Sequence, residues 1–339
     1  PVKSLFDDFI HIQNMFVSSD TLTYSQQLCI REVMDYFVAL NQILVLFLLT
    51  GVGFFCRRAG ILNQNSVSSL SKFLLNICIP AMIIYSMQIP FSQSIAEKSG
   101  TLIFAALCYY VIAFAVCFVT PYILRCKKEE YGVFRFMTMF SNSMFMGFPI
   151  LSMFFGPEAI FYAAIFNIPF TLLTYSVGIW ILRSGEGGIS FSWKLLLNAA
   201  FLSTFVGILF FVTSFSILDP FYGALGLLSD ITTPMSLVVT GGFLASLETK
   251  AIFSNVRQYF AAGIRLLIIP ALAFAVCSLF ITDPLILGIT VVTAGMPAAV
   301  NTVILAEEHD ARPDIAAQGV FISTLLCILT IPLLAVFIG

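Results

Sequence analysis

Asn142-Ser-Met-Phe-Met-Gly-Phe-Pro149 and Gly295-Met-Pro-Ala-Ala-Val-Asn301 are the stretches that decide the fold. Each places glycine, proline and asparagine in the middle of an apolar segment long enough to cross a bilayer. A helix in lipid has no water to satisfy its backbone, so a break is tolerated only where protein or a water-filled cavity surrounds it. Paired breaks at corresponding places in two halves of a chain indicate the binding site of an inverted-repeat transporter.

The composition is that of a membrane protein. Hydrophobic residues make up 59% of the chain and charged residues 10%, whereas soluble domains carry about a quarter charged residues. We predict an all-α membrane protein, because the apolar segments are continuous and do not alternate as in a β-barrel. Ten spans of about 20 residues fit: 36–56, 66–87, 99–124, 132–154, 158–182, 194–213, 221–247, 258–280, 284–306 and 314–338. The seventh span begins near either 221 or 228.

Basic residues predict the orientation of the chain, because they concentrate in cytoplasmic loops. If the first span runs from outside to inside, most of them fall on the cytoplasmic side, with Lys98 as the clear exception. We therefore predict a multi-pass protein of the plasma membrane with both termini extracytoplasmic. The net charge of −2 and the absence of a basic run give no indication of a nucleic-acid partner.

Landmarks recur in the two halves at similar offsets. Pro80 matches Pro234, Ala113–Cys117 reads AFAVC as does Ala273–Cys277, and Pro149 matches Pro297. Because five spans are an odd number, a second five-span half must be inserted upside down. We therefore predict two inverted five-helix repeats, 34–183 and 194–339, joined by a short cytoplasmic loop, 184–193. Residues 1–33 are a polar N-terminal extension that we expect to be non-essential, and Met34 is a candidate start.

The residues in the two breaks predict a binding site for an anion. Proline removes a backbone hydrogen bond and glycine lets the backbone unwind, so we expect helices four and nine to break at these residues and to cross. Half-helix N-termini would then direct positive partial charge at the crossing, which favours a carboxylate. The alternative is that the prolines only kink ordinary helices. The predicted substrate-binding residues of the two breaks are Ser141, Asn142, Gly147, Pro149, Gly295, Pro297 and Asn301.

The first stretch resembles the N-x-x-x-M-G-x-P-L motif of the auxin efflux carrier family, which includes plant auxin carriers and bacterial malate permeases. Further stretches from 34 to 339 are similar to its motifs: Leu227-Leu-Ser-Asp-Ile, Arg265 with Pro270, Gly295-Met-Pro-Ala-Ala, Ala306-Glu-Glu-His and Pro313-Asp-Ile. The resemblance implies a homodimer, a scaffold region and a moving region that contains the crossing. It also implies that Asn142 and an Asn of helix six bind the substrate carboxylate. Asn198 matches that second position, although Ala199 replaces the usual proline.

Two charged residues in spans are candidates for coupling or gating, because charge inside a membrane is costly. Asp230 and Arg265 could form a pair, or Asp230 could carry a coupling proton; Asp230 could equally be a surface or capping residue. Neither break contains a carboxylate, which weakly disfavours a sodium site. Protons, sodium and the membrane potential all stay open as the coupling force.

The sequence contains no catalytic set, so we predict that the chain is not an enzyme. The H-E-x-x-H, G-x-x-x-x-G-K and G-x-S-x-G motifs are absent from the sequence. We expect no cofactor and no metal. The predicted function is a secondary transporter that exports or exchanges small organic anions by alternating access, with the substrate held where helices four and nine cross. The alternative is a ligand-binding sensor or a channel-like protein on the same fold.

Overall fold

The computed structural model describes residues 44–183, 199–245 and 255–338, and this part of the chain is built of helices. The extension 1–33, the loop 184–193 and Asn198 lie outside the described residues. A helix over 44–58 comes first. The α-helices that follow are α3 Gln64–Phe73, α4 Ile79–Ser86, α5 Gln93–Ile123, α6 Tyr131–Met139, α7 Phe148–Phe155, α8 Ala159–Leu173, α9 Ile179–Leu182, α11 Ala199–Thr213, α12 Phe221–Ala245, α14 Val256–Gly263, α15 Ile269–Cys277, α16 Pro284–Ala294, α17 Asn301–Glu308 and α18 Pro313–Ile338.

Five continuous helical stretches in the described part are long and apolar enough to cross a membrane. They are Gln64–Ser86, Gln93–Ile123, Phe221–Ala245, Val256–Cys277 and Pro313–Leu334. A sixth is present if Ala159–Leu173 and Ser176–Leu182, which meet at 44°, form one bent span. The structure is therefore that of a multi-pass membrane protein. Because α12 begins at Phe221, the seventh predicted span has the earlier of its two expected starts.

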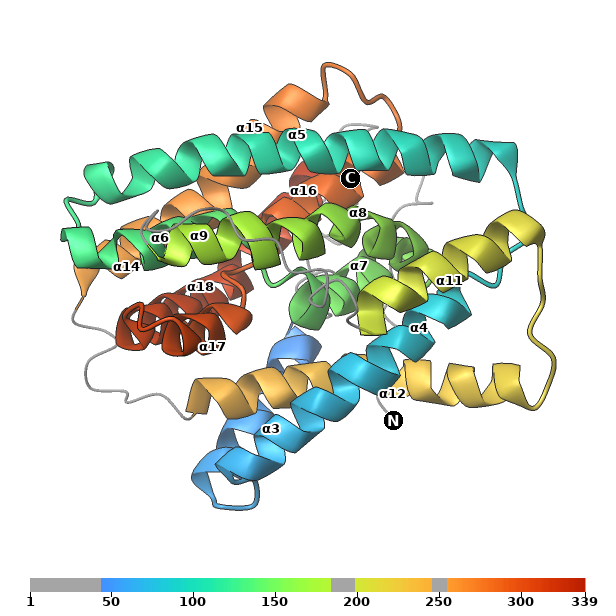
Figure 1. The fold of residues 1–339 in the computed structure, drawn as a ribbon, viewed down its shortest axis with the longest axis horizontal. Helices are drawn as coiled ribbons and strands as arrows, with labels where there is room; N and C mark the ends of the chain where they lie inside the picture. The colour runs from blue at the N-terminus through green and yellow to red at the C-terminus, as the bar shows by residue number, and fades with distance from the viewer. Residues whose placement is uncertain (1–43, 184–198, 246–254, 339) are drawn as a thin grey trace, which may run out of the picture.

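The helices pack as two groups. The support group consists of the helix over 44–58, α3, α4, α11 and α12, and α4 packs against both α11 and α12. The crossing group contains α5 to α9 and α14 to α18. Figure 1 shows α3, α4, α11 and α12 in the lower part of the view, below α5, α6, α8 and α9. The groups meet where α4 and α11 contact α8 and where α12 contacts residues 143–147.

Glycines allow the helix over 44–58 to approach α12 closely. A Cβ atom on Gly241 would collide with the Thr50 carbonyl oxygen, and one on Gly53 would collide with the Val238 carbonyl oxygen. Small residues of this kind let backbones approach in membrane proteins, where van der Waals packing contributes much of the association energy. The support group is therefore closely packed at this contact.

Prolines explain three of the π-helical turns in the described chain. The turns η1 Leu74–Cys78, η3 Ser143–Gly147 and η5 Ile264–Ile268 each end two residues before a proline: Pro80, Pro149 and Pro270. Each proline then takes the first or second position of the α-helix that follows. A proline fits there, because the first amides of a helix lack an intrahelical acceptor. The helices continue through these prolines.

Candidate functional site: the crossing of two broken helices

The two broken helices cross and are joined by their main chains. Helix α6 ends at Met139, and the segment after it pairs with the segment after α16. The Asn142 amide N–H donates to the Pro297 carbonyl oxygen (N···O 2.8 Å), and the Ala299 N–H donates to the Phe140 carbonyl oxygen (3.1 Å). Ser141 and Ala298 thus form an isolated antiparallel bridge. This bridge satisfies backbone groups that neither broken helix can satisfy within itself.

The first break does not lie where glycine and proline predicted it. The chain leaves the helix at Phe140–Asn142, and Gly147 and Pro149 belong to the helical continuation, η3 and α7. The expectation of unwinding at Gly147 and Pro149 was wrong, because Pro149 occupies the second position of α7, which needs no amide donor. The second break agrees with the prediction: Gly295 follows the last residue of α16, and Pro297 lies between α16 and α17.

Asn142 and Ser141 place free polar atoms at the crossing. The Asn142 side chain is buried, and its Nδ2 has no hydrogen-bond partner among the described residues; the same holds for Ser141 Oγ. An unsatisfied buried polar group costs about 1–3 kcal/mol. Such groups call for an explanation, and an acceptor that binds there, such as a carboxylate oxygen, supplies one.

Two helix N-termini begin at the crossing. The turn η3 starts directly after Asn142 and continues into α7, and α17 starts at Asn301. The unsatisfied amides of a helix N-terminus carry about half a positive charge. The N-termini of η3 and α17 therefore direct positive potential at the place where the two broken segments pair. Gly147 lies beside this place, because a Cβ on it would come within 3.5 Å of Met296 Cγ.

Arg265 is fully buried and stabilises the end of α6. Its guanidinium donates to the Thr138 carbonyl oxygen (3.2 Å) and to Tyr109 Oη (3.0 Å), and Tyr109 Oη in turn donates to the Met139 carbonyl oxygen (3.3 Å). A cation at a helix C-terminus interacts favourably with the helix dipole and with the last carbonyls. Arg265 thus supports the half-helix that ends at the first break.

Asp230 is not a partner of Arg265. It lies on the exposed face of α12, and the four ion pairs of the described residues include neither of the two. The pair that the sequence left open is therefore not found. Asp230 lies within the long helix that begins at Phe221, about 13 Å from its first residue at 1.5 Å per residue.

Two small cavities flank the crossing. The first, about 10 Å³, lies between the two helix groups and is lined by residues such as Ile83, Phe148, Asn167 and Thr204. The second, also about 10 Å³, lies behind the crossing. Its lining includes Thr138, Gln258, Arg265, Ala298 and Ser323. Each has room for about one water molecule. Neither of these two cavities has room for an organic anion.

Three further polar residues at the crossing were not predicted as site residues. Ser143 Oγ donates to Asn167 Oδ1, and Asn167 Nδ2 donates to the Ala163 carbonyl oxygen (2.8 Å). Ser323 Oγ accepts a hydrogen bond from the Ala298 N–H (3.1 Å). In the sequence these residues look like the many serines and asparagines that bond between membrane helices. Only their contacts with the two breaks distinguish them.

The charge around the crossing is positive. Arg265 lines the cavity behind the crossing, and neither cavity has a carboxylate in its lining. In the described part of the chain, no group of three or more His, Cys, Asp or Glu residues could hold a metal ion. The residues that surround the crossing are therefore suited to an anion and offer no acidic ligands to a cation.

Comparisons with known proteins identify the family of the chain. The sequence model of a family described as "Membrane transport protein" matches residues 38–192 and 188–335. An uncharacterized transporter of Methanocaldococcus jannaschii is 26% identical over 311 residues, which cover 87% of this chain and 97% of that protein. An uncharacterized transporter of Methanothermobacter thermautotrophicus is 25% identical over 307 residues, 87% of this chain and 95% of that protein. The family and both relatives are transporters and not enzymes.

Proposed function

The chain belongs to the membrane transport protein family, as its resemblance to auxin efflux carriers predicted, and on that premise we propose that it is a secondary transporter of small organic anions. The substrate carboxylate binds where the two broken helices cross. The observation that carries this proposal is the unpartnered, buried amide Nδ2 of Asn142, placed beside the start of a helix. A neutral amide donor next to helix N-termini binds an anion without a countercharge of its own.

The contacts between the helix groups support alternating access. The crossing group meets α4, α11 and α12 across a boundary that contains the small cavity lined by Asn167. In our proposal the crossing group moves against the support group, and this cavity opens to one side of the membrane at a time. The residues of the crossing are paired through the main chain, so they move together.

The finer architecture is part of the same proposal. Ten spans form two inverted five-helix repeats, 34–183 and 194–339, in a homodimer whose termini are extracytoplasmic. Three apolar helices shorter than a full span fit this arrangement: Ser143–Phe155 and Pro284–Ala294 belong to the broken helices, and Ala199–Thr213 completes helix six. Asn198, which directly precedes α11, is proposed as the second amide for the carboxylate.

Charged residues have separate roles in this proposal. Arg265 is a gating cation, because it lines the cavity behind the crossing and holds the end of α6. Asp230 is the candidate for a coupling proton. Proton coupling through Asp230 predicts that an Asp230→Asn carrier loses proton-driven uptake but retains substrate exchange, and unchanged proton-driven uptake would remove Asp230 from coupling.

Asn142→Ala tests the binding site. Loss of a hydrogen bond to a charged group costs about 1.5–3 kcal/mol, so we expect the dissociation constant for a bound carboxylate to rise about tenfold or more. Binding is measured by calorimetry on the carboxylic acid that a thermal-shift screen selects. Asn76→Ala is the matched control, because Asn76 is exposed and donates to the Lys72 carbonyl oxygen of its own helix. Equal affinities for the wild type and Asn142→Ala would remove Asn142 from the site.

Proteoliposomes test transport itself. We expect counterflow of a radiolabelled carboxylate, and we expect the methyl ester of the same acid to be taken up more slowly. Equal uptake of acid and ester would contradict recognition of the anion. Binding without flux would indicate a sensor, and an uncoupled current would indicate a channel.

A further inference from the structure

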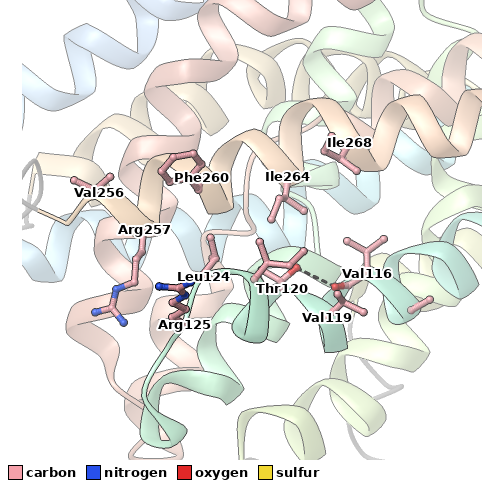
Figure 2. A pocket seen from close by; sticks show the side chains of 12 residues that line it. Val116, Val119, Thr120, Leu124, Arg125, Val256, Arg257, Phe260, Ile264 and Ile268 are labelled. Atoms are coloured by element: carbon pink, nitrogen blue, oxygen red, sulfur yellow. Dashed lines mark hydrogen bonds between the residues drawn. The ribbon is translucent and has the colours of Figure 1, made fainter.

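A large apolar groove lies outside the crossing, between α5 and α14 with its continuation η5. Its volume is about 790 Å³, within the usual range of about 300–1,000 Å³ for ligand pockets. Val116 and Thr120 of α5 face Ile264 and Ile268 across it (Figure 2), and Val119, Ile123 and Phe260 also line it. Helix α5 packs closely on α15, and the groove opens farther along, where α5 faces α14.

The groove is as deep as one leaflet of a bilayer. Its walls run from Ala115 to Arg125 on α5 and from Val256 to Ile268 on α14 and η5. At 1.5 Å per residue these lengths are about 15 and 18 Å, and half of the hydrocarbon core measures about 15 Å. Thr120 adds no free hydroxyl to the wall, because its Oγ1 donates to the Val116 carbonyl oxygen (2.9 Å). An acyl chain of one leaflet therefore matches the groove in length and polarity.

Two arginines lie at one end of the groove. Figure 2 shows Arg125 and Arg257 at the end where Leu124 and Val256 also lie. Arg257 is paired with Glu130 (2.6 Å), and Glu129 is paired with Arg312 (3.3 Å). The ion pairs of the described residues do not include Arg125, which is exposed.

The end that carries Arg125 is strongly basic. The exposed Lys127 and Lys128 follow Arg125 after one residue, and both nearby acids are already paired. An excess of basic residues marks the cytoplasmic surface, where anionic lipids lie in the membrane. Arginine binds phosphate through two parallel hydrogen bonds. The open end of the groove thus offers a free guanidinium at the depth of lipid headgroups.

We propose that this groove binds an anionic phospholipid of the cytoplasmic leaflet. One acyl chain lies between α5 and α14, and the headgroup phosphate is bound by Arg125, with Lys127 and Lys128 adding positive charge. Because this site is separate from the crossing, the proposal does not depend on the identity of the transported substrate. The lipid would fill the space between two helices of the crossing group.

Native mass spectrometry of the full chain in detergent tests the headgroup site. The probes are dioleoyl-phosphatidylglycerol and dioleoyl-phosphatidylcholine at equal concentrations. We expect the wild type to retain the anionic lipid at least threefold over the neutral one, and Arg125→Gln to abolish most of this preference. Lys72→Gln is the matched control, because it removes one exposed charge from α3 in the support group.

Val119→Trp tests the acyl-chain site independently of charge. A large ring at this position fills the groove, so we expect retention of both lipids to fall at least threefold. Val111→Trp is the control, because Val111 is an exposed residue of the same helix outside the groove. Inorganic phosphate at millimolar concentration should not displace the lipid, because it lacks the acyl chain.

Clear outcomes would overturn the proposal. These are equal retention of the two lipids by the wild type, an undiminished preference in Arg125→Gln, or unchanged retention in Val119→Trp. Displacement of the lipid by inorganic phosphate would indicate a simple anion site instead. Cross-linking between cysteines introduced at position 119 of two copies would show that a second chain covers the groove. Arg125 and Val119 are both exposed, so we expect thermal melting to show that Arg125→Gln and Val119→Trp stay folded.

Discussion

The two breaks of the crossing are held together in different ways. The first break is short, runs from Phe140 to Asn142, and follows a half-helix whose end is bound by the buried Arg265 and Tyr109. The second break is longer, runs from Gly295 to Val300, and has one of its amides bound by Ser323. Side chains from outside thus stabilise both breaks, but only the first combines a buried cation with a free buried amide.

This difference separates support from recognition. Arg265 and Ser323 make hydrogen bonds to backbone groups, so they maintain the shape of the crossing. The side-chain Nδ2 of Asn142 makes none among the described residues, so that amide is available to a ligand. Stability and binding should therefore respond to different substitutions, and the following experiments test this separation.

We expect the largest effect from Arg265→Met. The change leaves the Thr138 carbonyl oxygen and the Tyr109 hydroxyl without a charged donor, and each buried group that loses its partner costs about 1–3 kcal/mol. The free energy of unfolding in detergent should fall by about 2–4 kcal/mol. Arg265→Lys retains the charge, so its free energy of unfolding should lie between those of the wild type and Arg265→Met. A melting curve that matches the wild type would show that Arg265 does not support the first break.

Ser323→Ala should have a smaller effect on the second break. It leaves the buried Ala298 N–H without an acceptor, which costs about 1–2 kcal/mol in the free energy of unfolding. Thermal melting in the same detergent measures this change. Ser278→Ala is the control, because the exposed Ser278 hydroxyl bonds only to the Ala275 carbonyl oxygen of its own helix. Equal losses in the two variants would mean that the second break does not depend on Ser323.

Asn142→Ala should leave stability almost unchanged when no substrate is present. Because Nδ2 has no partner to lose, we expect a change within about 0.5 kcal/mol, or a gain of up to about 1 kcal/mol from removing an unsatisfied group. The melting temperature without ligand measures this. A loss comparable to that of Ser323→Ala would show that Asn142 is a structural residue.

The smallest effect should come from pH at the N-terminus of α16. Burial alone would raise the pKa of Asp283, but the Lys98 ammonium and the amides of Ile286 and Leu285 hold it below its ordinary value. A lowered acid pKa adds stability above the unfolded pKa of about 3.9, and this stability is lost as the pH falls through the folded value. For this partly exposed pair the contribution is at most about 1 kcal/mol.

Asp283→Asn checks this pH dependence. Asparagine retains an acceptor for the Leu285 and Ile286 amides but removes the charge. The wild type should lose slightly more stability than the variant between pH 5 and about pH 3. Parallel melting temperatures over this range would show that the ion pair contributes nothing to the anchoring of α16.

The sequence predicted the helical segments and the two interrupted spans because hydrophobic length and proline are local signals. It misplaced the first break, since Gly147 and Pro149 identify the right helix but lie one to two turns beyond the residues that leave it. Asn142 was predicted as a site residue because it stands in an apolar span. The roles of Asn167 and Ser323 depend on contacts with distant segments, which no local pattern records.

Arg265 shows the same limit for charge. Its position in a span marked it as unusual, but the sequence suggested Asp230 as a partner. The structure gives it one backbone carbonyl and a tyrosine instead, because the end of a broken helix supplies negative potential without an acid. A helix end can thus replace a carboxylate, and a search for acidic partners would miss it.

The bonds between Asn142 and Pro297 and between Phe140 and Ala299 join main-chain atoms only. A substitution that leaves the backbone path unchanged cannot remove these acceptors, and only a new proline at 142 or 299 would remove a donor. Related chains can therefore change the side chains at these positions and still retain the bridge. Insertion or deletion of a single residue would shift one segment of the bridge against the other, and we expect this change to disrupt the bridge.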